Sequence, residues 1–385
     1  MNYSEKEIDK ALAYHKTLKV QGLLSPDIEA RATSAFTHAS MFDIETYDLY
    51  PKSPIYEAAV VHGVENPSIK HTFVNAQGGE ISKFTADQFL KRQAGMSPWL
   101  QDALAAATTT QEQVAQLALD ELKGRDVWVQ NLPFERSFVK ERTTREQFNA
   151  WAVDSRLESY TPGSGLYTTS PNIKKALTHA GAGQTTSNSI DEYLGRWSSV
   201  FDEFEHTLES KRPSNVTRIF DVQDLTRSVF ALAQKNNVMG KTGELFSGTS
   251  IDTLSKAIFG LEEHHTAAGN SVLQGPIAKF LYGTGLAIKQ GKGLTDRQKS
   301  FFHHVAASQK VAKQQGAVKN IIETYKAQQK YLSIADDRTI PQKAKIDVLS
   351  RARTDFSSEA RPINLQVLDH ASDTYSREAA TYIAR

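Results

Sequence analysis

Three short β-rich runs follow one another between residues 37 and 76, and this order constrains the fold more than any other feature. The runs read SMFDIETYDLY, SPIYEAAVVHGV and IKHTFVNA, and Pro, Ser or Asn separates them. Consecutive runs of this kind predict an antiparallel meander. A later apolar run, DVWVQN at 126–131, is typical of a buried parallel strand. We therefore expect an α/β fold with a mixed sheet, in which three antiparallel strands precede the parallel ones, flanked by helices.

Helical patterns surround these strands and suggest three regions. Ser4 is a candidate N-cap for a helical pattern over 4–34, and TTTQEQ at 108–113 resembles a capping box. The other predicted helices lie within 82–124, 134–158, 190–211, 250–260 and 265–283, and 218–235 is predicted to be a short strand that leads into a helix. We expect an N-terminal helical segment (1–36), a central domain (37–290) with an insertion at 141–215, and a helical C-terminal region (291–385).

Composition excludes several classes of site. The 45 basic and 44 acidic residues nearly cancel, so the net charge neither favours nor opposes a nucleic acid partner. The absence of cysteine excludes disulfides, thiolate metal sites and a cysteine nucleophile. No stretch approaches the roughly 18 apolar residues of a membrane helix, and the N-terminus lacks the apolar core of a signal peptide. We expect a cytoplasmic protein with no membrane partner.

Two carboxylates interrupt the first β-rich run. In FDIET, Asp43 and Glu45 are two residues apart and therefore share one face of a strand, while Phe42 and Ile44 share the other. Neighbouring carboxylates repel unless a positive charge lies between them, and burying a lone carboxylate is costly. A divalent cation would satisfy the pair. The ordinary alternative is an edge strand with two solvated acids.

Two further segments carry candidate functional groups. In WVQNLPFERSFV, a strand ends at Asn131 and Glu135 falls in the first turn of the next helix, where an acid is also favoured by the helix dipole. In LEEHHTAAGN, His265 precedes or opens a helix and Asn270 lies five residues later, although the adjacent His264 is a second candidate. Taken alone, each of these residues also has a purely structural explanation.

Together, FDIET, NLPFE and HTAAGN resemble the DEDD-type 3′–5′ exonucleases, the proofreading-exonuclease superfamily with an RNase H-like fold. The family's first motif is Asp-x-Glu on a strand, its second is Asn-x-x-Phe-Asp after the central strand, and its third is His-x-Ala-x-x-Asp on the last helix. The resemblance covers about 37–140 and 216–283, and Asp221 matches the usual start of the segment before the third motif. It departs from the family at Glu135, which replaces Asp, and at Asn270, which stands where an acid is expected.

The resemblance implies two-metal hydrolysis of phosphodiester bonds with two Mg²⁺ or Mn²⁺ ions. It implies that Asp43 bridges both ions and that Glu45 and the residue at 270 hold one of them. It also implies that Glu135 contacts the metal site directly or through water, and that His265 is the general base. Asn131 would orient the end of its strand. The other implied nucleic-acid contacts are Phe42, Ile44, Thr46 and Phe134, with Arg136, Lys140 or Arg142 near phosphates. The expected substrate is single-stranded DNA or a DNA 3′ end, and RNA stays open.

Asn270 leaves three interpretations open, because a neutral amide lacks the charge that helps to hold a divalent cation. In the first interpretation, Asn270 is a deliberate replacement of Asp that traps substrate. In the second, the natural site is weakened. In the third, Glu262 or Glu263 replaces the missing acid. We favour the first two, since both glutamates precede His265.

The sequence thus predicts a stand-alone 3′–5′ exonuclease, and the alternative is an impaired nuclease fold that binds single-stranded nucleic acid without cutting. The C-terminal helices are a candidate nucleic-acid-binding segment. We favour the simpler interpretation that they form a solvated helical face or an oligomer contact.

Overall fold

The structure is a computed structural model, and it describes residues 2–18, 22–47, 53–75, 99–144, 187–211, 217–239 and 250–305. Residues 1–308 form one compact unit and residues 309–385 a second, which lies outside the described residues. The predicted helix at 82–98, most of the predicted insertion and the C-terminal region from residue 306 also lie outside them.

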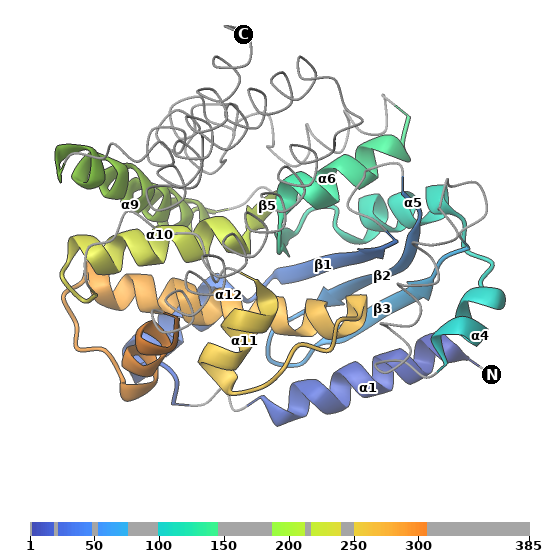
Figure 1. The fold of residues 1–385 in the computed structure, drawn as a ribbon, viewed down its shortest axis with the longest axis horizontal. Helices are drawn as coiled ribbons and strands as arrows, with labels where there is room; N and C mark the ends of the chain where they lie inside the picture. Colours follow the sequence, from blue (N-terminus) through green and yellow to red (C-terminus); the bar gives the residue numbers. More distant parts are fainter. Residues whose placement is uncertain are drawn as a thin grey trace, which may run out of the picture. The chain divides into compact units, whose positions relative to one another are not determined.

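A five-stranded mixed sheet lies at the centre of the fold (Figure 1). Its strands are β1 (Ala39–Thr46), β2 (Ile55–His62), β3 (Ser68–Phe73), β4 (Asp126–Val129) and β5 (Arg218–Asp221), in the spatial order β3-β2-β1-β4-β5. The β1–β2 and β2–β3 pairs are antiparallel, whereas β1–β4 and β4–β5 are parallel. The prediction of an α/β fold with antiparallel strands before parallel ones is confirmed.

Two N-terminal helices, α1 (Tyr3–Thr17) and α2 (Pro26–Ala35), replace the single helical stretch predicted over 4–34. The N-cap of α1 is Asn2, not Ser4, because the Asn2 side chain accepts a hydrogen bond from the backbone N–H of Glu5. Ser25 followed by a proline at the first helical position starts α2, as is common at helix N-termini. Both helices contribute to the main hydrophobic core, so this segment packs with the sheet.

Within the described stretch 99–144, three helices follow β3: α4 (Leu100–Ala105), α5 (Gln111–Glu121) and α6 (Leu132–Glu141). The predicted capping box at the start of α5 is confirmed, since Thr110 and Gln113 each bind the other's backbone N–H. The helix predicted over 134–158 is interrupted, because α6 ends at Glu141, and residues 145–158 lie outside the described residues. The guanidinium of Arg142, just past that end, donates to the backbone carbonyls of Phe138 and Ser53.

The remaining named helices are α9 (Ser187–Glu209), α10 (Val222–Lys235), α11 (Ile251–Phe259) and α12 (Ala267–Lys289). Almost every residue of α12 is buried, and the helix packs against β1, β2, α1, α2 and α10 (Figure 1). A Cβ atom on Gly275 would lie 3.0 Å from the Met41 side chain, so the glycine permits the close approach of α12 to β1. None of the described helices is long and apolar enough to cross a membrane.

Aromatic side chains stack on one another in the core beside β4. Trp128, which has no exposed surface, stacks on Phe220 of β5 with ring centroids 4.8 Å apart and on Phe36 with centroids 4.9 Å apart. Such pairs add about 0.5–1.5 kcal/mol beyond the burial of their area. These contacts join the parallel strands β4 and β5 to the end of α2.

Candidate active site

The two acids of β1 share one face of the sheet, as their spacing predicts. Asp43 pairs in register with Ala59 and Glu45 with Glu57, and a register shift follows between Glu45 and Thr46. Asp43 is buried and Glu45 is partly buried. The alternative of two solvated edge-strand acids is wrong, because β1 is the central strand and α12 covers this face.

Helix α12 presents two amides to these two acids. The Asn270 Nδ2 donates to Glu45 Oε1 over 3.0 Å, and the Gln274 Nε2 donates to Asp43 Oδ1 over 3.0 Å. Four residues of helix rise by about 6 Å, which nearly matches the roughly 6.7 Å between alternate residues of a strand. A helix that runs antiparallel to β1 can therefore place one amide over each carboxylate.

The third acid, Glu135, lies in the first turn of α6 and is buried. Its position depends on Asp221 at the end of β5. Asp221 accepts from the backbone N–H of Leu132 over 2.9 Å, and it also caps α10 through the N–H of Asp224 over 3.1 Å. One buried carboxylate therefore ties together the starts of α6 and α10. Asn131 is the N-cap residue of α6, and its carbonyl accepts from the Glu135 N–H.

The acids raise one another's proton affinity. Burial raises the pKa of Asp43 well above its usual range, and the negative charges of Glu45 and Glu135 raise it further. Burial also raises the pKa of Glu45 to about 8, with further contributions from Glu57 and Glu263. The pKa of Glu135 is raised by burial and by the charge of Asp221. Groups of mutually repelling, desolvated carboxylates are typical of functional sites.

Four buried oxygen atoms at this site accept no hydrogen bond within the described part of the chain. They are Asp43 Oδ2, Glu135 Oε2, Asn270 Oδ1 and Gln274 Oε1. A buried acceptor without a donor is unfavourable by about 1–3 kcal/mol. Oxygen donors are the ligands that Mg²⁺ and Mn²⁺ prefer, so the chemistry of this set fits a hard divalent cation. Among the described residues, however, no three His, Asp or Glu side chains by themselves form a cluster that could hold an ion.

His265 lies in the loop before α12. Its backbone has a φ of +47°, and its Nδ1 lies 3.3 Å from Glu263 Oε1. The adjacent His264 is instead stacked on Tyr14, with ring centroids 3.8 Å apart. The structure therefore separates the two histidines, because His264 packs against α1 while His265 pairs with an acid.

The residues expected to frame a nucleotide have different environments. Phe42 and Ile44 are buried in the main core on the face opposite the acids, so their side chains do not lie at the site as expected. Phe134 is partly buried and packs against Phe138 with the two rings tilted and their centroids 4.6 Å apart. Thr46 is partly exposed at the end of β1.

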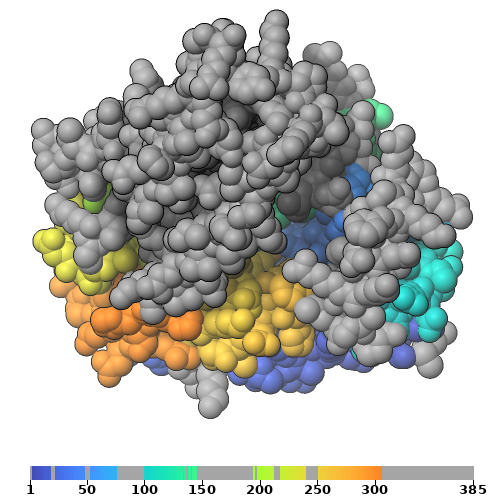
Figure 2. Space-filling model, viewed as in Figure 1, coloured from blue at the N-terminus to red at the C-terminus, as the bar shows by residue number. Residues whose placement is uncertain are grey.

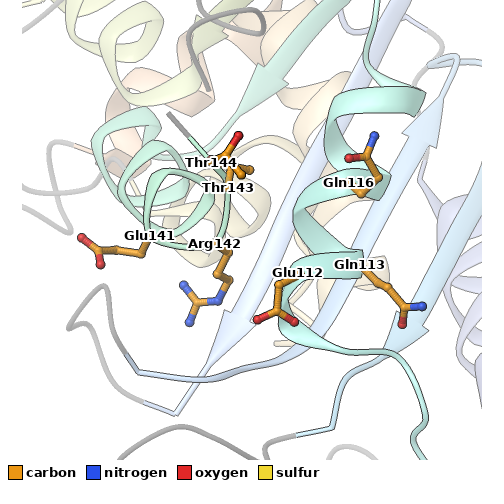
Figure 3. Close-up of a pocket in the computed structure, with 7 residues that line it drawn as sticks. All are labelled: Glu112, Gln113, Gln116, Glu141, Arg142, Thr143 and Thr144. Atoms are coloured by element: carbon orange, nitrogen blue, oxygen red, sulfur yellow. The ribbon is translucent and has the colours of Figure 1, made fainter. Parts of the chain in front are cut away.

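Arg142 contributes to a separate hollow between α5 and α6. The hollow has a volume of about 470 Å³ (Figure 3), and its lining residues are Glu112, Gln113, Gln116, Glu141, Arg142, Thr143 and Thr144. The Arg142 guanidinium also donates to Gln111 Oε1 over 2.9 Å, in addition to its two backbone carbonyls. These contacts give Arg142 a structural role, which differs from the phosphate contact that was one expectation for it.

Sequence reasoning missed Gln274 and Glu57 as members of this region, and it named Asp221 only as the start of a segment. Gln274 follows Asn270 by four residues, so helical periodicity could have found it. Glu57 pairs with His71 on β3, with the two side chains 2 % and 0 % exposed and the His71 Nε2 2.8 Å from Glu57 Oε1. No local sequence pattern predicts this pair, because Glu57 and His71 lie on two different strands.

The comparisons with protein-family models and with curated proteins found no relative of this chain. No protein-family model matches the chain, and no curated protein matches it significantly. The functional interpretation therefore depends on the geometry described above and on the resemblance of the three motifs.

Proposed function

We propose that this chain is a metal-dependent 3′–5′ exonuclease of nucleic acid, with DNA the favoured substrate. One observation supports this most strongly. Three elements, β1, α6 and α12, carry buried oxygen atoms without donors, and the charges of Glu45 and Glu135 raise the pKa of Asp43. The sheet also has antiparallel strands followed by parallel ones, which is the arrangement that an RNase H-like fold implies.

The residues that would hold divalent ions are Asp43, Glu45 and Glu135, with the amide oxygen of Asn270 at the fourth position. Two bound ions would supply electrostatic stabilisation to the attacking and leaving oxygens of a phosphodiester. His265 would take the proton from the attacking water, because imidazole titrates near neutral pH. The carboxylates keep raised pKa values until a cation neutralises their repulsion.

A second function has its own supporting observation. The amide N–H groups of Asn270 and Gln274 already donate to Glu45 and Asp43, so they offset part of the cost of burying these acids without any metal. A site stabilised in this way suits a nuclease fold that binds single-stranded nucleic acid and does not cut it. The same amides support either function, so the two must be separated by experiment.

The test compares the chain with Asn270→Asp, Asp43→Ala and the two changes combined. Cleavage of a 5′-labelled single-stranded DNA is followed with Mg²⁺ or Mn²⁺ and with EDTA, and Mn²⁺ binding is measured by calorimetry. We expect Asn270→Asp to bind Mn²⁺ more tightly, since a charged oxygen replaces a neutral one, and to shorten the DNA from its 3′ end. Asp43→Ala should abolish both effects.

Control measurements distinguish the alternatives. Glu262→Gln removes an acid that is 85 % exposed and should leave both readouts unchanged. If the original chain already cuts and Asp43→Ala stops it, Asn270 is a competent ligand. If no variant cuts DNA or the matching RNA, while labelled single strands still bind in EDTA, the binding function replaces the exonuclease.

A further inference from the structure

The loop that precedes α12 contains a carboxylate–imidazole pair. The Glu263 Oε1 and the His265 Nδ1 are 3.3 Å apart, and their side chains are 11 % and 41 % exposed. A mostly buried carboxylate thus faces one nitrogen of a more accessible imidazole. Glu263 differs in this respect from its neighbour Glu262, whose side chain is 85 % exposed.

The backbone around this pair is fixed on both sides. The Tyr14 hydroxyl donates to the carbonyl of Glu262 over 2.5 Å, and the Tyr14 ring stacks on His264. Thr266 caps α12 through the N–H of Gly269, over 3.1 Å. Contacts with α1 and α12 therefore hold the residues immediately beside the pair.

His265 itself has a left-handed backbone, with a φ of +47°. This conformation is unfavourable for a residue with a bulky side chain, and it persists only where the surroundings enforce it. Strain of this kind concentrates at functional sites, where it holds a side chain in one direction. The anchored loop and the left-handed residue together set the backbone from which the imidazole projects toward Glu263.

Glu263 also lies within electrostatic reach of the candidate active site. The negative charge of Glu263 contributes to the raised pKa values of both Asp43 and Glu45. The loop leads into α12, which carries Asn270 to Glu45. Residues around 250–266, yellow to gold in Figure 2, form part of the molecular surface beside the N-terminal helices. Water and a nucleic acid strand could therefore approach this loop from solvent.

We infer that Glu263 is a positioning residue, which accepts a hydrogen bond from His265 Nδ1–H and so directs His265 Nε2 to act as the base. This role rests on the proposed exonuclease function. A carboxylate on one ring nitrogen selects the tautomer whose other nitrogen carries the lone pair, and it stabilises the imidazolium that forms. Glu263 thus orients the base; it does not replace the acid missing at position 270.

The proposed step is hydrolysis of the 3′-terminal phosphodiester. Nε2 takes one proton from water while the water oxygen forms a bond to phosphorus. The bond between phosphorus and the 3′ oxygen of the preceding nucleotide breaks, and that oxygen takes a proton from solvent. A nucleoside 5′-monophosphate leaves, and the imidazolium later returns its proton to solvent.

The first test measures the tautomer and needs no activity. The full chain is labelled with ¹⁵N-histidine, and the ring nitrogen shifts are recorded in EDTA, with the His265 signals identified by their loss in His265→Asn. Asparagine tolerates a left-handed backbone, so that variant should keep the loop intact. We expect His265 to carry its proton on Nδ1 and Glu263→Ala to shift it toward Nε2. An unchanged tautomer in Glu263→Ala would overturn the inference.

The second test measures catalysis in the Asn270→Asp background. Glu263→Ala should lower kcat by roughly tenfold to a hundredfold with little change in KM, less than the 10²–10⁴ that a general base typically contributes. Glu263→Gln should recover part of the loss, since its amide oxygen still accepts from Nδ1–H. Weaker Mn²⁺ binding in Glu263→Ala, equal to that in Asp43→Ala, would instead make Glu263 a metal ligand and overturn the inference.

The two tests separate this inference from the function on which it rests. If Asn270→Asp does not cut, the exonuclease function fails, and the catalytic role of Glu263 fails with it. If Asn270→Asp cuts but Glu263→Ala changes neither tautomer nor kcat, only the present inference fails.

Discussion

Replacing Glu45 with glutamine should stabilise the metal-free protein at pH 8 and do much less at pH 5. Burial and the charges of Glu57 and Glu263 raise the pKa of Glu45 to about 8. An acid whose pKa is higher in the folded state binds an additional proton there, so the free energy of unfolding falls as pH rises from about 4.5 to 8. Glutamine has no charge to desolvate and should remove this contribution.

The magnitude follows from the displacement of that pKa. A rise from 4.5 to about 8 corresponds to about 5 kcal/mol, at about 1.36 kcal/mol per pKa unit. Because the Glu45 side chain keeps some contact with solvent, we expect less than half of this, about 2 kcal/mol. Glutamine preserves an oxygen that can accept from Asn270 Nδ2, so packing and hydrogen bonding change little.

Urea unfolding in EDTA at pH 5 and pH 8 measures this difference. The quantity of interest is the gain in unfolding free energy for Glu45→Gln at pH 8 minus the gain at pH 5, which we expect to be about +2 kcal/mol. Glu262→Gln, which alters an exposed acid, should give a value near zero. Mn²⁺ should reduce the loss of stability at pH 8 in the original chain. Equal gains at the two pH values would refute the reasoning, because they would show that Glu45 does not titrate in this interval.

Two further changes test the local structure that positions the site. Asp221→Ala removes the acceptor for the N–H groups of Leu132 and Asp224; we expect a loss of about 1–3 kcal/mol in urea unfolding, and Asp221→Asn should lose less. In Gly269→Ala the new Cβ would lie 2.7 Å from the Cβ of His264, so we expect destabilisation by about 1–3 kcal/mol despite the better helix former. Gly195→Ala is the matched control, because among the described residues no atom beyond its chain neighbours and its own helix backbone lies within 4 Å of the new Cβ, and the change should stabilise α9 by about 0.5–1 kcal/mol. A Gly269→Ala protein as stable as the Gly195→Ala protein would contradict this account.

The sequence by itself determined the secondary structure of the sheet and the faces of its central strand. Alternation in FDIET placed Asp43 and Glu45 on one face, and the structure confirms it. The order of β-rich and helical runs predicted the mixed sheet, and TTTQEQ predicted the start of α5. These predictions succeed because periodicity and capping depend on residues that are close in the chain.

Only the tertiary structure decided which groups meet those acids. The packing of α12 against β1 brings Gln274 to Asp43 and Asn270 to Glu45, across more than two hundred residues of sequence. The anchoring of the loop by Tyr14 likewise separates the two histidines and turns His265 toward Glu263. A local pattern shows which face of an element is polar, but it cannot show where another element packs. That position depends on shape and close approach throughout the core, so the partners of Asp43 and Glu45 could not be predicted from the sequence.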